Sequence, residues 1–169
     1  CIRDSVDNAK IRAIYEDHNQ NLWIGCYHRG MVMVSKESTP FHFWSVPTRE
    51  YPQAGVITAL YKDDDGHIVS GVEGEGVFKI TSEGNITDHL FSGKTVSSIY
   101  KDYSGNLWFG GYYSGLYMQD AKGNVRFMLP EIKLKDIKKI TGDDKGNLYL
   151  SLFGSGFIRY HLPTQTVTE

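Results

Sequence analysis

The sequence predicts an all-β protein in which one four-stranded antiparallel unit occurs four times. The first observation is an internal repeat, because ungapped stretches of similar sequence begin at Ile11, Ile57, Val96 and Ile137, roughly 42 residues apart. The second is that apolar residues within each copy alternate or form short groups, without the spacing of about 3.6 residues that helices show. The third is the regular return of Asp, Gly and Asn between these groups, where turns are expected.

Each copy opens with an expected strand that carries apolar residues on both faces. In the first copy, Ile11, Ala13 and Tyr15 share one face and Ile14 lies on the other. This pattern is typical of a strand that is buried on both faces.

A turn follows the first strand, with the sequences DHNQN, DDDGH, DYSGN and DDKGN. The leading Asp can accept hydrogen bonds from the backbone amides that follow it, and the Gly three residues later tolerates a positive φ. Gln20 replaces this Gly in the first copy. Either Gln20 adopts the same backbone conformation or the first turn differs from the others.

The second strand is expected at residues 22–26, 68–72, 107–111 and 148–152. One residue of this strand is small in every copy, which indicates that a neighbouring sheet packs closely there; these residues are Gly25, Gly71, Gly110 and Ser151. Another glycine, at 30, 76, 115 and 156, ends the next connection and is expected to supply a positive φ. A third and a fourth strand complete each copy.

Four strands in about 42 residues expose too much apolar surface to be stable alone, so each sheet must stack on its neighbours. Radial stacking of such sheets is a β-propeller, which has about four to eight blades. We therefore expect one propeller domain over residues 1–169, with blades at 11–50, 57–92, 96–130 and 137–169. The last copy stops where its fourth strand should begin. The chain is thus expected to be an arc of a larger propeller, or half of an eight-blade ring that a homodimer closes.

Composition excludes several classes of protein. Hydrophobic residues make up 40% of the chain and charged residues 22%, which fits a globular domain and not a disordered one. The net charge of −2 gives no attraction to nucleic acid, and we expect no direct insertion into a membrane. The lysines at 133, 135, 138 and 139 are interpreted as part of a solvated loop.

Patterns for catalysis and metal binding are weak. The six histidines include no pair at the spacing of a helical zinc motif, and no cluster of His and Cys is present. Residues 63–66, DDDG, are similar to part of a calcium loop, but Tyr61 and Val72 occupy its first and twelfth ligand positions. We therefore expect no catalytic residue, no metal and no cofactor.

The runs IYEDHNQNLWIG and IYKDYSGNLWFG resemble the two-component regulator propeller repeat, whose pattern is roughly apolar-x-x-I-x-x-D-x-x-G-N-L-W-I-G-T-x-x-G-G-L. The second copy departs from it at His67 and Val69, and the fourth at Tyr149 and Ser151. The resemblance implies a periplasmic sensor region of a hybrid two-component system, a protein type common in gut Bacteroidetes. Such regions respond to glycan fragments and signal to a cytoplasmic histidine kinase. The implied partners are an oligosaccharide and the remaining blades and kinase modules of a larger protein.

Repeated residues are explained most simply by a repeated structural need, so Asp17, Asp102, Trp23 and Trp108 are interpreted as structural. Function is expected where the copies differ, in the connections YHRG, EGEG, YYSG and GSG between the second and third strands. In a propeller these connections and the loops before the first strands surround the mouth of the central channel. The candidate ligand-binding residues at this mouth are Tyr27, His28, Arg29, Arg49, Tyr51, Glu73, Glu75, Lys94, Tyr112 and Tyr113. Aromatic faces suit the C–H faces of sugars, while Arg and Glu can bond hydroxyl or uronate groups.

Two other functions stay open at this point. One is an enzyme similar to the streptogramin lyases, which are propellers with comparable D-x-x-G-x-L-W blades that use a histidine and Mg²⁺ on one face. In this sequence His28 is the one histidine at the expected mouth. The other is a structural module whose exposed blade faces drive oligomerisation without a small ligand.

Overall fold

A computed structural model describes residues 10–28, 30–36, 42–44, 46, 55–130 and 136–168 of the chain. The described residues form sixteen β-strands, which confirms the all-β prediction. None of them belongs to a helix with the length and apolar character needed to cross a membrane. The chain divides into two compact units, Cys1–Gly93 and Lys94–Glu169.

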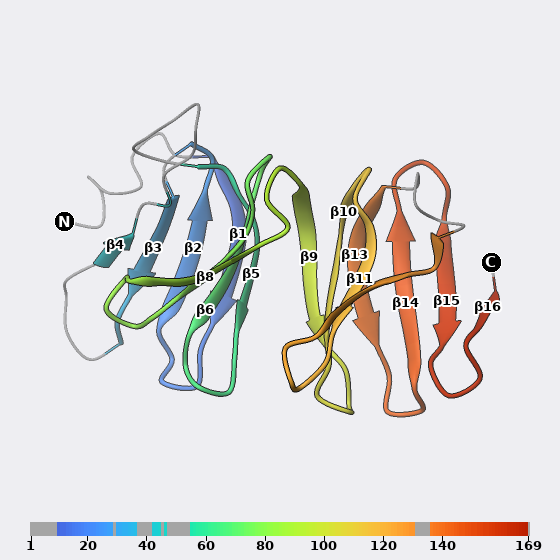
Figure 1. The fold of residues 1–169 in the computed structure, drawn as a ribbon. Coiled ribbons are helices and arrows are strands. Elements are labelled where there is room, and N and C mark those ends of the chain that lie inside the picture. The colour runs from blue at the N-terminus through green and yellow to red at the C-terminus, as the bar shows by residue number, and fades with distance from the viewer. Residues whose placement is uncertain are drawn as a thin grey trace. The chain divides into compact units, whose positions relative to one another are not determined.

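Unit 1 holds two antiparallel sheets, in each of which strands that follow one another in sequence are neighbours (Figure 1). The first sheet consists of β1 (Ile11–Glu16), β2 (Leu22–Cys26), β3 (Gly30–Val34) and β4 (His42–Trp44). The second consists of β5 (Ile57–Lys62), β6 (Ile68–Val72), β7 (Gly76–Ile80) and β8 (Ile86–Leu90). Both are the four-stranded meanders that the repeat predicts.

Unit 2 repeats this arrangement (Figure 1). Its first sheet consists of β9 (Thr95–Lys101), β10 (Leu107–Tyr112), β11 (Gly115–Gln119) and β12 (Val125–Met128). Its second consists of β13 (Ile137–Gly142), β14 (Asn147–Leu152), β15 (Phe157–His161) and β16 (Thr166–Thr168). The predicted second strands agree with the structure to within one residue, and β16 supplies the fourth strand of the last copy.

Neighbouring sheets within each unit pack through an isoleucine and a glycine. In unit 1, Cγ2 of Ile57 lies 3.0 Å from the point where a Cβ would stand on Gly25. In unit 2, Cγ2 of Ile137 lies 2.7 Å from the corresponding point on Gly110. Ile57 and Ile137 are fully buried. The close approach predicted at the small residue is therefore confirmed at Gly25 and Gly110, and the group that approaches is a β-branched side chain from the first strand of the next sheet.

The first strand of the chain departs from the expected burial on both faces. Ala13 and Tyr15 of β1 are half-buried on the side of the second sheet, but Ile11 and Ile14 are exposed. The reason is that, within the described residues of unit 1, a neighbouring sheet packs against one face of β1 alone, through β5. The expectation that Ile11 shares a face with Ala13 and Tyr15 is wrong, because the register shift between Ile11 and Ala13 places Ile11 on the face of Ile14. The apolar pattern predicted burial of both faces of this strand, but a face is buried only where a neighbouring sheet packs on it.

The turn between the first and second strands is organised by one carboxylate. Oδ1 of Asp17 accepts hydrogen bonds from the backbone N–H groups of Asn19 at 2.9 Å and Asn21 at 3.0 Å. Oδ2 accepts from the side-chain amide of Asn21 at 3.0 Å and from the indole Nε1 of Trp23 at 2.9 Å. Gln20 has a φ of 61°, so this residue adopts the left-handed backbone that glycine provides elsewhere.

The same turn recurs in unit 2. Trp108 Nε1 donates to Oδ2 of Asp102 at 2.8 Å, and the Tyr149 hydroxyl donates to Oδ2 of Asp143 at 3.1 Å. Trp23 and Trp108 are buried, so each indole ties its turn to the core, in agreement with the structural interpretation of these residues. The hydrogen bonds from the backbone and side chain of Asn147 are the main causes that lower the pKa of Asp143 to about 2.

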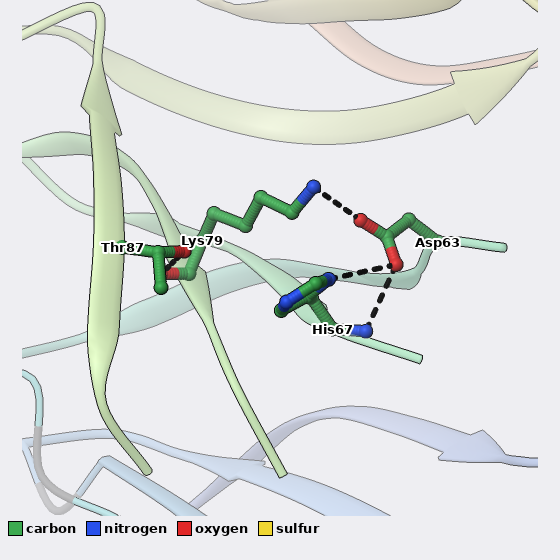
Figure 2. Close-up of polar contacts among 4 residues, drawn as sticks. All are labelled: Asp63, His67, Lys79 and Thr87. Atoms are coloured by element: carbon green, nitrogen blue, oxygen red, sulfur yellow. Dashed lines mark hydrogen bonds and ion pairs between the residues drawn. The ribbon is translucent and has the colours of Figure 1, made fainter. Parts of the chain in front are cut away.

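The second sheet lacks the aromatic donor and uses an ion pair instead. Val69 stands at the position of Trp23, and Nζ of Lys79 on β7 lies 2.7 Å from Oδ2 of Asp63 (Figure 2). The His67 backbone N–H donates to Oδ1 of Asp63 at 2.8 Å, and the ring Nδ1 of His67 lies 3.4 Å from the same oxygen. Burial acts to raise the pKa of Asp63, but the hydrogen bonds from Lys79 and His67 outweigh it and lower this pKa overall. The Thr87 hydroxyl donates to the Lys79 carbonyl at 3.3 Å and links β8 to β7 (Figure 2).

The contact between isoleucine and glycine can be tested by a double-mutant cycle in unit 2. Gly110→Ala places a methyl group 2.7 Å from Ile137 Cγ2, and overpacking of this kind costs about 1–3 kcal/mol. Ile137→Ala leaves a cavity and should cost about 2–5 kcal/mol. The double variant should lose less stability in urea unfolding than the two single losses combined, because the smaller side chain makes room for the added methyl. Additive losses would contradict direct packing between the two residues.

The carboxylate turns predict loss of stability in acid. Because the folded pKa of Asp143, about 2, lies below its ordinary value of 3.8, its contribution is present above about pH 4 and is lost as the pH falls through 2. Asp143→Asn should therefore lower the thermal midpoint at pH 7 and flatten its dependence on pH between about 4 and 2. Asp144→Asn, an exposed residue of the same turn, serves as the control. Equal pH profiles for both variants would refute this role of Asp143.

The ion pair in the second sheet should depend on salt. Lys79→Met removes the donor to Asp63 and should lower the free energy of unfolding by about 1 kcal/mol, a modest value because the Lys79 side chain is 33% exposed and its charge is screened. The difference from the parent chain should shrink in about 1 M salt. Lys122→Met, in an exposed turn, should show neither effect.

Candidate functional site

Each sheet has two ends with different chemistry. The aspartate turns lie at one end, which we call the hairpin end, and the connections between the second and third strands lie at the other, which we call the loop end. Of the expected mouth residues, Arg29, Arg49 and Tyr51 lie outside the described residues. Tyr27, His28, Glu73 and Glu75 belong to unit 1, and Lys94, Tyr112 and Tyr113 belong to unit 2. A single mouth shared by all of them stays a prediction.

The loop end of unit 1 brings a cation and two rings together. The Tyr27 and His28 rings meet edge to face with centroids 4.0 Å apart, and the guanidinium carbon of Arg12 lies 4.9 Å from the Tyr27 centroid. Arg12 stands where the pairing of β1 with β2 shifts register, between Ile11 and Ala13. The Tyr27 backbone N–H donates to the Lys10 carbonyl at 2.7 Å and fixes this loop.

The second loop of unit 1 is held by backbone contacts. The Glu73 N–H donates to the Val56 carbonyl at 2.9 Å, and the Glu75 carbonyl lies 2.6 Å from Nε2 of His89. The His89 ring in turn stacks on Phe78 at 4.2 Å. Glu73 is exposed and Glu75 is half-buried. These bonds account for the shape of the loop.

The loop end of unit 2 carries a lysine between two aromatic rings. Nζ of Lys138 lies 5.4 Å from the Tyr112 centroid and 4.9 Å from the Phe153 centroid. These distances are in the range of cation–π contacts. Lys138, like Arg12, occupies a register shift in the first strand of its sheet, between Ile137 and Lys139. Tyr112 and Phe153 belong to different sheets, so the lysine bridges the two neighbouring loops.

One aspartate anchors both of these loops. Oδ1 of Asp136 accepts the Tyr113 N–H at 2.9 Å, and the Asp136 carbonyl accepts the Phe153 N–H at 2.9 Å. The rings nevertheless stay open to solvent, since Tyr113 is 74% and Phe153 is 64% exposed. We call Tyr112, Tyr113, Lys138 and Phe153 the aromatic platform. It is an exposed surface within unit 2 whose two loops are held by hydrogen bonds of their backbone.

Sequence reasoning found two members of this platform and missed two. Lys138 and Lys139 lie in strand β13, so their interpretation as part of a solvated loop is wrong. The signal was available, because Lys138 aligns with Arg12 in the repeat and both positions are cationic. Phe153 directly precedes the variable GSG connection. Nζ of Lys94, another expected mouth residue, lies 5.7 Å from the Tyr117 centroid.

The hairpin end of unit 1 contains a cleft of about 440 Å³ that the sequence did not predict. Trp23 and Trp44 stack on each other in its wall with centroids 4.9 Å apart. Lys62, Asp65 and Glu83 line its polar side.

Three side chains near this cleft have the composition of a cation site. Ligand atoms of Asp63, Asp65 and His67 lie within 4.8 Å of one another, and no other such group occurs in the described part of the chain. Asp63 already contacts the Lys79 ammonium, which a metal ion would have to displace (Figure 2). The contacts present are those of the turn that the sequence predicted for the DDDG run.

Comparison with known families supports the repeat assignment. The family described as two-component regulator propeller matches residues 5–28 and 90–113. These stretches include the aspartate turns and second strands of the first sheet of each unit. A search of curated protein sequences finds no match to the chain.

Solved structures share the fold at low sequence identity. The extracellular domain of a protein assigned to the hybrid two-component systems of B. thetaiotaomicron superposes with a TM-score of 0.71 and 20% identity, over 89% of this chain and 21% of that one. A catalytically inactive virginiamycin B lyase from Staphylococcus aureus, solved with quinupristin, gives 0.76 and 15%, over 95% and 55%. PorZ, a surface component of the type-IX secretion system of Porphyromonas gingivalis, gives 0.64 and 13%, over 95% and 27%.

These similarities define the fold and leave the activity open. The chain spans about a fifth of the B. thetaiotaomicron domain and about half of the lyase. Extracellular domains of two-component systems and an enzyme both occur among the neighbours. The chain therefore folds into blade-like sheets of the β-propeller type, and residues 5–28 and 90–113 match the two-component regulator propeller repeat.

Proposed function

We propose that this chain is a ligand-sensing part of the extracytoplasmic, periplasmic region of a hybrid two-component system, and that it binds a carbohydrate fragment at the loop end. The repeat and the B. thetaiotaomicron structure support the class of protein. The aromatic platform supports the position of the site and the chemistry of the ligand. In this proposal the chain is a binding module and not an enzyme.

The observation that carries the proposal is that the platform is exposed and fixed at the same time. Exposed aromatic rings cost solvation free energy unless a ligand covers them, and rings on an anchored backbone lose little entropy when they bind. Asp136 provides that anchor for the loops of Tyr113 and Phe153. Tyr112 and Phe153 can stack on the C–H faces of sugar rings, while the Lys138 ammonium donates to hydroxyl or carboxylate oxygens.

The position of the platform also offers a route for a signal. Its residues come from β10, from the loop after it, from β13 and from the loop after β14, so a ligand held by Tyr112 and Phe153 would contact two sheets at once. Binding would then stabilise one arrangement of these sheets relative to others, which is how a ligand shifts a conformational equilibrium. In this proposal the change in conformational equilibrium is transmitted to the kinase modules of the larger protein.

Calorimetric titration with neutral and uronate-containing oligosaccharides tests the site. Tyr112→Ala and Phe153→Ala should each weaken binding about tenfold, because each removes a stacking surface. Lys138→Met should reduce affinity for acidic sugars more than for neutral ones. Tyr103→Ala is the matched control, since Tyr103 is an exposed aromatic residue of unit 2 at the hairpin end. If no carbohydrate binds, or if the platform variants bind as well as the parent chain, the proposed site is wrong.

Comparison of the parent chain with His28→Ala distinguishes a binding module from an enzyme. A lyase-like function would rest on His28, the histidine that the sequence predicts at the mouth. Turnover of a streptogramin B antibiotic by the parent chain, abolished in His28→Ala, would favour the enzyme. Carbohydrate binding that His28→Ala retains, without such turnover in the parent, supports the binding module.

A further inference from the structure

The cleft at the hairpin end of unit 1 is separate from the proposed carbohydrate site. Its volume of about 440 Å³ is in the range of small-molecule sites, roughly 300–1,000 Å³. Residues of the first sheet line one wall, and residues of the second sheet line the other. Both sheets belong to one compact unit, so the cleft is a feature of unit 1 alone.

The wall formed by the first sheet is apolar and aromatic. Trp23, Met33 and Trp44 contribute to it, and the two indole rings are nearly parallel, at 13°, with centroids 4.9 Å apart. Trp44 also reaches the second sheet, because its ring occupies the space that a side chain on Gly84 would fill. The aromatic wall is therefore held by both sheets, and the apolar part of a ligand would meet a surface that is already in place.

Most polar groups around the cleft already have partners within the protein. The turn carboxylate of Asp17 accepts four hydrogen bonds in its own turn. Oγ1 of Thr81 accepts from the backbone N–H groups of Glu83 and Asn85, and the Ser82 hydroxyl donates to Oε1 of Glu83. These groups hold the turns at the rim of the cleft and have little capacity left for a ligand.

Two charged groups of opposite sign remain available on the second sheet. Lys62 is the half-buried last residue of β5, and Asp65 is exposed in the turn that follows. In the described part of the chain, neither the Lys62 ammonium nor the Asp65 carboxylate takes part in a hydrogen bond or an ion pair. Asp65 lies within 4.8 Å of ligand atoms of Asp63 and His67, but the Lys79 ammonium already balances the charge of Asp63.

We propose that this cleft binds a small zwitterion of the class of the α-amino acids with an apolar side chain. The ammonium of the ligand pairs with Asp65, its carboxylate pairs with Lys62, and its side chain lies on the aromatic wall. Lys62 and Asp65 are three positions apart in one turn, so they suit a ligand whose two charges are also close together. Both pairs are charge-assisted hydrogen bonds at a site partly shielded from water, which strengthens them.

Calorimetric titration of the full chain with three probes tests this proposal. L-Phenylalanine carries both charges, 3-phenylpropanoate lacks the ammonium, and 2-phenylethylamine lacks the carboxylate. The parent chain should bind phenylalanine about tenfold more tightly than either analogue, because each analogue leaves one charged group of the cleft without a partner.

Two variants assign each charge of the ligand to one residue. Lys62→Met should weaken binding of phenylalanine and 3-phenylpropanoate about tenfold and leave binding of 2-phenylethylamine unchanged. Asp65→Asn should weaken binding of phenylalanine and 2-phenylethylamine and leave binding of 3-phenylpropanoate unchanged. Lys122→Met and Asp144→Asn, at exposed positions of unit 2, are the matched controls and should bind all three probes as the parent chain does.

Several results would overturn the proposal. One is the absence of phenylalanine binding at millimolar concentrations, and another is an analogue that binds the parent chain as tightly as phenylalanine. An equal loss of all three probes in Lys62→Met or Asp65→Asn also overturns it, because damage to the fold and not a missing charge would explain such a loss. Circular dichroism identifies that damage.

The test is independent of the carbohydrate site. The aromatic platform lies at the loop end of unit 2, and the cleft lies at the hairpin end of unit 1. Oligosaccharide titrations of Lys62→Met and Asp65→Asn should therefore match those of the parent chain. A parent chain that binds no carbohydrate would refute the proposed function and leave the phenylalanine titration as a separate measurement of the cleft.

Discussion

Close packing of an isoleucine on a glycine joins neighbouring sheets, and the rest of the structure depends on it. Each four-stranded sheet has apolar residues on both faces, so a single sheet would expose a large part of the surface that should form its core. Ile57 and Ile137 become fully buried only because Gly25 and Gly110 leave room for their methyl groups. The two sheets of each unit therefore bury a shared face against each other.

The features that the sequence predicted well are those that a few adjacent residues determine. Asp17 organises its turn through hydrogen bonds to residues two, four and six positions away, and Gln20 adopts the conformation that glycine has in the other copies. Exposure of Ile11 was not predictable in this way, because burial depends on a neighbouring sheet. The pairing of Lys79 with Asp63 also escaped prediction, since it joins a turn residue to a residue of β7 that is distant in the sequence. It replaces the aromatic donor that the second sheet lacks at Val69.

The platform residue Lys138 shows how packing and site chemistry are connected. The first strand of each sheet shifts register near its start, which adds one residue to the strand. In β13, Ile137 packs on the preceding sheet. The extra residue that follows it does not fit the alternation of side chains between the two faces of the sheet. Lys138 and Arg12 are such residues, and both contact aromatic rings of the loop end. A search based on alternation alone treats this position as irregular and overlooks it.

The two ends of the sheets differ in their capacity to bind a ligand. Asp17 and Asp102 each accept four hydrogen bonds within their own turns, which occupies essentially all the acceptor positions of a carboxylate. Such groups have no capacity left for a partner, so repetition at the hairpin end reflects folding. The backbone of the platform loops is equally well bonded, but the rings of Tyr113 and Phe153 and the Lys138 ammonium remain accessible. At the loop end the backbone is anchored while the side chains are exposed, so these side chains can differ between copies without loss of the fold. Such differences allow one repeat to acquire specificity for a ligand.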